Sequence, residues 1–297
     1  MSAVTATGLD TAQPNGPREI IARRPGRRER DPVRASRRLR ARNLLLGLGF
    51  PVSLLLLWQG ASSLGFLDPR LYPSPTDVVA AIGSLQERDL LVGNLLITVE
   101  RIVKGYAFGA AVAIVVGVLM GLSPWFRAML EPMLSALYTV PKLALLPIFL
   151  TIFGFGELPI VVIIAVATFF FVWISTLAAI LAVPHGYREA GYTLNLSRWQ
   201  TFRHVLLPAA LPEIFVGLRI AAGVAVLMLV GVEFVIASSG LGYLIEQGRA
   251  ALLIAQTYAG IVLIALLGLI LTTLIRMIGK LATPWNGSSD RAIGGPM

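Results

Sequence analysis

The sequence contains no cysteine and only two histidines, His185 and His204, among its 297 residues. The absence of cysteine excludes a disulfide framework, a thiolate metal site and a cysteine nucleophile. Two histidines are too few for a multi-histidine metal centre. Charged residues are also scarce, at 14% of the chain, whereas a soluble domain usually carries about 25%. So few charges cannot hydrate the surface of a soluble enzyme, and a disordered protein is excluded as well.

Apolar residues are abundant instead, at 56% of the chain, and the mean hydropathy is +0.77. A membrane-spanning helix needs about 20 mostly apolar residues. The sequence therefore predicts an all-α, polytopic membrane protein with about six transmembrane helices, expected at 44–64, 99–122, 133–153, 159–181, 212–237 and 252–279.

The third of these stretches is interrupted by Pro141 and Pro147 and contains Lys142. A helix that faces lipid cannot satisfy the backbone groups that prolines leave free, whereas neighbouring helices can. We therefore expect a broken span that lies inside the bundle.

The first 42 residues differ in composition from the rest, with eleven arginines and four acidic residues. Such a segment cannot bury enough apolar surface to fold, so we expect a basic, disordered tail at 1–42, a membrane domain at 43–283 and a second tail at 284–297. A nucleic-acid-binding arm is the alternative, but no aromatic residue is interleaved for base stacking. We expect no nucleic-acid partner.

Basic residues are distributed unevenly between the loops. If the N-terminus is cytoplasmic, the inner segments carry 18 Lys and Arg residues and the outer loops carry three. This asymmetry predicts that both termini lie on the cytoplasmic side. In the outer segment 65–98, apolar residues recur at helical spacing from Thr76 to Leu85. They predict a short amphipathic helix that lies on the membrane surface or on the bundle.

The longest inner loop, 182–211, has the pattern of two short helices joined by a sharp turn. The first helix is expected at 187–194, followed by Asn195, a residue able to adopt the left-handed conformation that ends a helix. Ser197 and Gln200 form a capping-box pattern at the start of the second helix.

Two prolines follow, one in this loop and one directly after it. Pro208 is expected to end the second helix and Pro212 to open the fifth span. The resulting hairpin has an apolar face that either binds a partner protein or packs on the protein's own spans. This face consists of Leu194, Trp199, Phe202, Val205 and Leu206.

The same loop resembles the EAA loop of the membrane subunits of ABC importers. That pattern is Glu-Ala-Ala, three residues, Gly, nine residues, then Ile-x-Leu-Pro. Glu189-Ala190-Gly191, Asn195 and Val205-Leu206-Leu207-Pro208 match its spacing in full. Gly191, Asn195 and Val205 depart from it in residue type, and Asn is the next best residue after Gly at a left-handed helix end.

Other stretches are similar to one branch of this family, which imports nitrate, sulfonates such as taurine, bicarbonate and related solutes. They are 94–105, 141–159 and 240–245, and the similarity covers roughly 71–280. The resemblance implies a permease of the ABC importer type I kind, with a first span at 44–64 and a permease core at about 91–280.

The resemblance also implies a division of labour among partners in a bacterial cytoplasmic (inner) membrane. Two copies of the chain would form a pathway for a small, anionic solute, two ATPase subunits would bind ATP and Mg, and an extracytoplasmic binding protein would deliver the solute. The chain has no G-x-x-x-x-G-K-[ST] motif, so we expect no ATP hydrolysis, catalytic residue or cofactor on it. The residues expected to couple to the ATPase are Glu189, Ala190, Gly191, Asn195, Ser197, Trp199, Val205, Leu207 and Pro208.

Ionisable residues inside spans are candidates for function because they are costly to insert. Glu233 is expected either to make a structural hydrogen bond, to Ser238, Ser239 or another helix, or to line or gate the pathway. Lys142 is expected to meet an anion or, in preference, to pair with Glu233 or Glu100.

Arg219, about two turns into the fifth span, is expected to snorkel, to make a structural bond or to reach the pathway. Glu100, Arg101 and Lys104 near the outer end of the second span are interpreted as interfacial anchors.

Two other classes of membrane protein remain as alternatives. An ion-coupled secondary transporter that uses Glu233 and Lys142 would suit the broken span, but six spans without an inverted repeat and a structured inner hairpin do not favour it. A membrane scaffold that recruits a cytoplasmic protein would keep the hairpin but would not need the charges inside the membrane.

Overall fold

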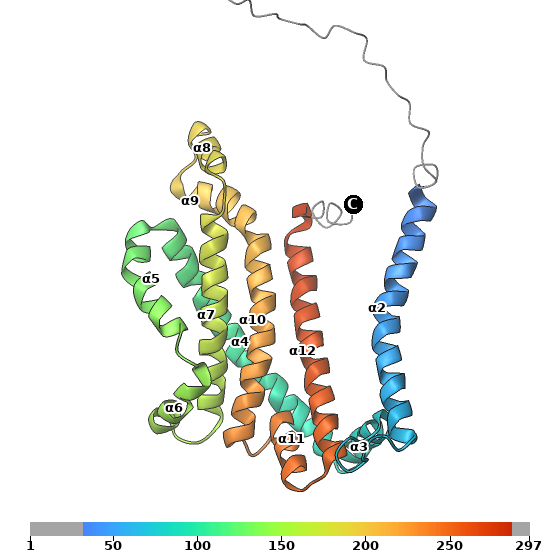
Figure 1. Ribbon diagram of the computed structural model, residues 1–297. Helices are drawn as coiled ribbons and strands as arrows, with labels where there is room; N and C mark the ends of the chain where they lie inside the picture. Colours follow the sequence, from blue (N-terminus) through green and yellow to red (C-terminus); the bar gives the residue numbers. More distant parts are fainter. Residues whose placement is uncertain (1–31, 287–297) are drawn as a thin grey trace, which may run out of the picture. The chain divides into compact units, whose positions relative to one another are not determined.

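The computed structural model describes residues 32–286, and every regular element within them is helical (Figure 1). A π-helical turn, η2 (Phe202–Leu206), joins α9 to α10, and the 3-10 turns η1 (Lys142–Leu145) and η3 (Pro284–Asn286) follow α5 and α12. In chain order the α-helices are α2 (Pro32–Ser63), α3 (Pro75–Glu87), α4 (Leu90–Leu122), α5 (Pro124–Tyr138), α6 (Leu146–Phe153), α7 (Glu157–Leu181), α8 (His185–Thr193), α9 (Arg198–Thr201), α10 (Leu207–Ile236), α11 (Leu241–Ala250) and α12 (Ile254–Ala282).

The described residues contain the spans that the sequence predicts. Five helical segments are long and apolar enough to cross a membrane, and α5 with η1 and α6 forms a further candidate crossing, bent by 92°. Pro141 lies directly before η1, so the third span is broken where it was expected to be. The five unbroken segments are Leu45–Ser63, Leu90–Leu122, Glu157–Leu181, Arg198–Ile236 and Ile254–Ala282.

Four expected boundaries are wrong. The third candidate crossing begins at Pro124 rather than 133. α4 begins at Leu90 rather than 99, and Asn94 on its second turn accepts from the N–H of Gly240 at 2.6 Å. The fifth crossing begins before Pro212, at Arg198. Residues 32–42, expected in the disordered tail, form the start of α2 because they follow Pro32 and consist largely of Arg and Ala, which favour helix. The rest of the expected tails, 1–31 and 287–297, lies outside the described residues.

The chain divides into two compact units, one ending at Leu57 and one beginning at Trp58. In the first unit, α2 continues through Pro51, and its side chains from Leu45 to Leu57 are exposed, as expected of a helix surrounded by lipid. The second unit contains the remaining helices and all the sites described below.

Helix α7 is the central helix of the second unit, where it packs against both α4 and α10. Two glycines of α4 allow a close approach. A Cβ atom on Gly117 would lie 2.8 Å from the Cβ of Thr176, and one on Gly121 would lie 2.6 Å from Cγ2 of Ile180. This is the small-residue packing typical of membrane helices.

The predicted amphipathic helix is α3, which packs on the bundle. Val78 and Leu85 are buried with Ala259 of α12. Ser74 caps the helix, and its hydroxyl and backbone N–H donate to Asp77 at 2.6 and 2.9 Å. These hydrogen bonds hold the pKa of Asp77 below its usual value.

The two ends of the second unit carry different elements. In Figure 1, α8 and α9 lie at one end, which we call the hairpin end, and α3, α6 and α11 lie at the other, the far end.

Candidate functional site

The loop 182–211 folds as the predicted hairpin of α8 and α9, which we call the coupling hairpin. Asn195 has φ of +54°, and the N–H of Leu196 donates to the carbonyl of Gly191 at 3.0 Å. A left-handed residue followed by this hydrogen bond is a common way to end a helix. The predicted turn at Asn195 is confirmed.

The start of α9 is fixed by a reciprocal capping box. The N–H of Gln200 donates to Oγ of Ser197 at 3.2 Å, and the N–H of Ser197 donates to Oε1 of Gln200 at 2.8 Å. Both halves of the predicted box are present. Hydrogen bonds therefore hold both sides of the turn between α8 and α9.

Gly191, which departs from the EAA pattern, lies where the two hairpin helices touch. A Cβ atom at this position would be 3.0 Å from Cγ2 and 3.2 Å from Oγ1 of Thr201, which is itself buried. The glycine therefore lets α8 pack more closely on α9 than an alanine would allow.

The second hairpin helix does not stop at Pro208, contrary to the sequence prediction. α9 continues through η2 into α10, with Pro208 in the first turn of α10 and Pro212 inside it. The N–H of Leu207 donates to the carbonyl of Phe202, five residues back, so the turn is widened just before Pro208. The helix therefore continues through Pro208 and Pro212, with the widened turn of η2 directly before the first of them.

Part of the hairpin's apolar face packs on the protein's own spans, and part of it is exposed and available to a partner protein. Leu206 is buried at 5% exposure in a cluster with Ile180 and Ile214, and Phe202 packs against that cluster. Leu194 and Trp199, by contrast, remain 70% and 64% exposed. One part of the face holds the hairpin on the bundle, and the other part is open to a partner.

Glu189 and Ala190 are also exposed on α8. The backbone carbonyl of Glu189 accepts from the Thr193 hydroxyl at 3.0 Å. Within residues 32–286, the Glu189 carboxylate has no hydrogen bond or ion pair to a described side chain. The acidic group at the start of the motif is therefore presented outward.

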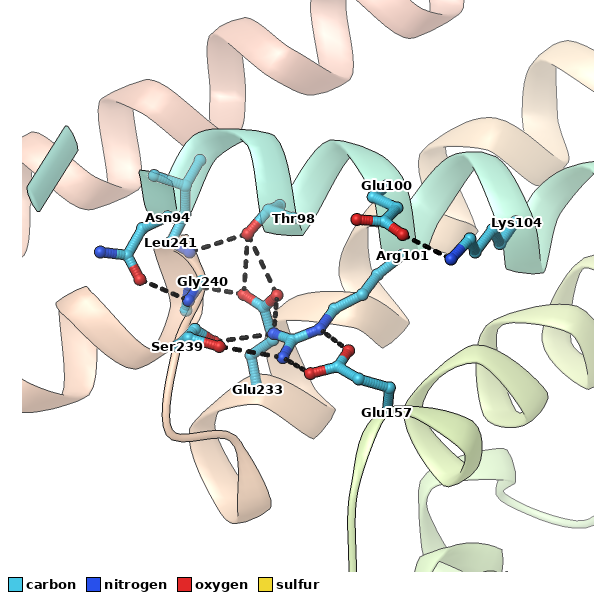
Figure 2. Close-up of polar contacts among 11 residues, drawn as sticks. Asn94, Thr98, Glu100, Arg101, Lys104, Glu157, Glu233, Ser239, Gly240 and Leu241 are labelled. Atoms are coloured by element: carbon cyan, nitrogen blue, oxygen red, sulfur yellow. Dashed lines mark hydrogen bonds and ion pairs between the residues drawn. The ribbon is translucent and has the colours of Figure 1, made fainter. Parts of the chain in front are cut away.

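At the far end, Glu233 is held in a buried polar network (Figure 2). Its carboxylate accepts from Nη1 of Arg101 at 2.8 Å, from Oγ1 of Thr98 at 3.1 Å and from the N–H of Gly242 at 2.7 Å. Thr98 and Arg101 belong to α4, so the structural bond to another helix that the sequence allowed is present.

Arg101 joins three helices at this point. Its Nε and Nη2 donate to Glu157, the first residue of α7, at 2.6 and 2.5 Å, and its Nη1 also donates to the Ser239 carbonyl at 2.7 Å (Figure 2). The side chain is 3% exposed. The interpretation of Arg101 as an interfacial anchor is therefore wrong.

A signal in the sequence could have identified this role. Arg101 shares a helical face with Thr98, Ile102 and Gly105, all of which are buried in the bundle. Glu100 and Lys104 lie on the exposed face of α4, where they pair with each other at 62% exposure each.

Lys142 does not pair with Glu233 or Glu100 as expected. Its Nζ donates to the carbonyls of Leu137 at 3.1 Å, Val140 at 2.8 Å and Tyr138, and it lies 4.4 Å from the centroid of the Phe170 ring. α5 ends at Tyr138 and leaves its last carbonyls without helical partners. The Lys142 ammonium group donates hydrogen bonds to these carbonyls instead of pairing with a carboxylate.

Arg219 is half-buried on α10. No ion pair joins it to the described residues. Snorkelling and a place at the pathway both remain predictions for this residue.

The second unit thus combines a broken span, a capped hairpin at one end and a buried ion-pair network at the other. The sequence matches the family described as "Binding-protein-dependent transport system inner membrane component" over residues 113–285. The chain belongs to this family and is a permease subunit of an ABC importer in the inner membrane.

Curated relatives agree with this assignment. The taurine transport system permease protein TauC of Escherichia coli (strain K12) is 33% identical over 262 residues, which cover 85% of this chain and 95% of the relative. The nitrate import permease protein NrtB of Synechocystis sp. (strain ATCC 27184 / PCC 6803 / Kazusa) is 32% identical over 191 residues, covering 64% and 70%. These relatives give no support to the secondary-transporter alternative.

A solved structure shows the same fold. A chain of the MetNI methionine ABC transporter, in an inward-facing conformation, matches with a TM-score of 0.57 and 22% identity. The match covers 65% of this chain and 96% of that chain.

Proposed function

We propose that two copies of this chain form the pathway of the importer and that the coupling hairpin binds a cytoplasmic ATPase. The observation that carries this proposal is the continuous helical rod from Arg198 to Ile236. One end of the rod is the hairpin, with Glu189 and Trp199 exposed beside it, and the other end carries Glu233.

The rod transmits movement from the ATPase subunits, as they close on ATP, to the far side of the membrane. At 1.5 Å per residue, its 39 residues span roughly 58 Å, longer than the hydrocarbon core of a bilayer. Because η2 is itself helical, no flexible linker separates the hairpin from α10. A displacement of the hairpin therefore moves α10 as one body against α4 and α7.

The ion pairs of Arg101 are the contacts that such a movement strains. They tie the outer ends of α4, α7 and α10 together through Glu157 and Glu233. Since Glu233 is buried and paired with Arg101, we assign it to gating at the outer end and not to direct contact with an anion. Lys142 caps α5, and Arg219 is the remaining cation near the pathway.

Membership of the family supports the following set of partners. ATP and Mg bind to two separate ATPase subunits, an extracytoplasmic binding protein delivers the solute to the far end, and lipid surrounds the bundle of 43–283. The hairpin end and both termini lie in the cytoplasm, which agrees with the excess of basic residues in those segments. We infer a small, anionic solute of the sulfonate, taurine, nitrate or bicarbonate kind, supported by the names of TauC and NrtB.

Uptake of labelled taurine and nitrate by cells that lack the chain, with and without its restored gene, tests this function. Uptake is expected to require both the chain and its ATPase. The importer assignment is falsified if uptake persists at full rate after the ATPase has been removed.

A further inference from the structure

A shallow groove lies beside the coupling hairpin and is formed by two distant parts of the chain. Tyr187 of α8, His204 of η2 and Pro208 of α10 line it together with Trp285 of η3. Trp285 follows the last span, about 80 residues after the hairpin. It is not part of the EAA pattern.

The position of Trp285 is set by the packing of α12. Gly279 lies against the ring of Phe215 on α10, so closely that a Cβ atom would be 3.0 Å from Cγ of that ring. Thr283 is buried, its hydroxyl donates to the Gly279 carbonyl at 2.8 Å, and its own carbonyl accepts from the N–H of Asn286 at 3.1 Å. The turn that carries Trp285 is therefore held on the bundle.

The groove presents aromatic side chains that the described residues do not cover. Trp285 is 55% exposed and Tyr187 is 52% exposed. Exposed aromatic groups that gather around a groove are typical of protein interfaces, and tryptophan and tyrosine often contribute most of the binding energy. Ala190, Val205 and Pro208, which are among the expected coupling residues, also line the groove, so it is continuous with the coupling surface.

We infer that Trp285 is part of the ATPase-binding surface and that the groove takes an apolar side chain of the ATPase. This inference rests on the proposed function of the coupling hairpin. It makes the ATPase contact a composite of the 182–211 segment and the end of α12. Movement of the ATPase would then act on α12 as well as on α10.

Affinity measurements with two matched variants test the inference. Full-length chain in lipid nanodiscs is titrated with the purified ATPase for the wild type, Trp285→Ala and Trp125→Ala. Trp125 is 67% exposed and lies just after Gly121, which packs on Ile180 at the hairpin end, but it does not line the groove. Trp285→Ala is expected to raise Kd by at least about tenfold, and Trp125→Ala by less than about threefold.

A cross-linking measurement identifies what occupies the groove. Because the chain has no cysteine, Trp285→Cys carries a unique thiol to which a photo-cross-linker can be attached. Cross-linking to the ATPase in the full complex supports the inference. Cross-linking to lipid alone, or to the chain itself, overturns it, because Trp285 then serves as an interfacial anchor or as a site for the chain's own end.

Glu189→Ala in the same titration separates the two proposals. If Glu189→Ala weakens ATPase binding and Trp285→Ala does not, the inference is wrong and the proposed function stands. If the wild-type chain binds no ATPase at all, the proposed function fails first.

Discussion

Arg101 on α4 and Glu233 on α10 form an ion pair of 2.8 Å between side chains that are 3% and 0% exposed. Glu157 shares the same guanidinium, so one cation serves two carboxylates. Such a group is costly to disrupt, because the removal of one partner leaves a buried charge without compensation. Under the proposed function, this network at the far end joins α4, α7 and the rod that carries Glu233, and it is the set of contacts that movement of the rod strains.

Arg101→Leu is expected to destabilise the chain by about 3–5 kcal/mol, because it leaves Glu233 buried without its cation. Lys104→Leu is the matched control, since its ion pair with Glu100 is exposed and should contribute less than about 1 kcal/mol. Thermal unfolding in detergent measures both. Equal losses from the two substitutions would contradict the assigned role of Arg101.

Glu233→Gln is expected to leave assembly intact and to reduce uptake. The amide oxygen can still accept from the N–H of Gly242, whereas the charge that holds Arg101 is lost. Uptake per molecule of assembled complex is the measurement. If the variant fails to assemble, Glu233 is a structural residue and not part of the gate.

Asn195→Val is expected to weaken ATPase binding, because a β-branched residue at a φ of +54° costs about 1–2 kcal/mol. Asn195→Gly is the control and should bind like the wild type, since glycine adopts this conformation freely. A titration with the ATPase compares the two. Unchanged binding by Asn195→Val would show that the shape of the turn does not matter for coupling.

Lys142→Met is expected to lower stability by about 1–3 kcal/mol while leaving the KM for solute unchanged, because the ammonium group binds three backbone carbonyls. Lys142→Arg retains donors and should lose less stability. Unfolding and uptake kinetics are measured on the same preparations. A large rise in KM without a loss of stability would instead place Lys142 at a solute site.

The features that were predicted correctly depend on neighbours in sequence. Asn195 and the Ser197–Gln200 box could be identified because a helix end is set by residues within one turn of it. The broken third span followed in the same way from Pro141.

The features that were missed depend on distant or unmarked partners. Arg101 and Glu233 lie 132 residues apart, so only the packing of α4 on α10 brings them together. The sequence favours a carboxylate partner for Lys142 because charges are visible in a sequence, whereas the free carbonyls at the end of α5 are not. It predicts a helix end at Pro208 because the widened turn of η2 has no clear sequence signal.

The central claim is that the coupling hairpin binds an ATPase, and co-purification tests it most directly. The tagged chain is extracted gently from its native membrane, beside Glu189→Ala and the control Glu131→Ala, which changes an exposed carboxylate on α5. The bound proteins are identified and quantified by mass spectrometry. We expect an ATPase near equal stoichiometry with the wild type and the control, and its loss or marked reduction with Glu189→Ala. A chain that emerges alone from a preparation in which other membrane complexes survive would contradict the account.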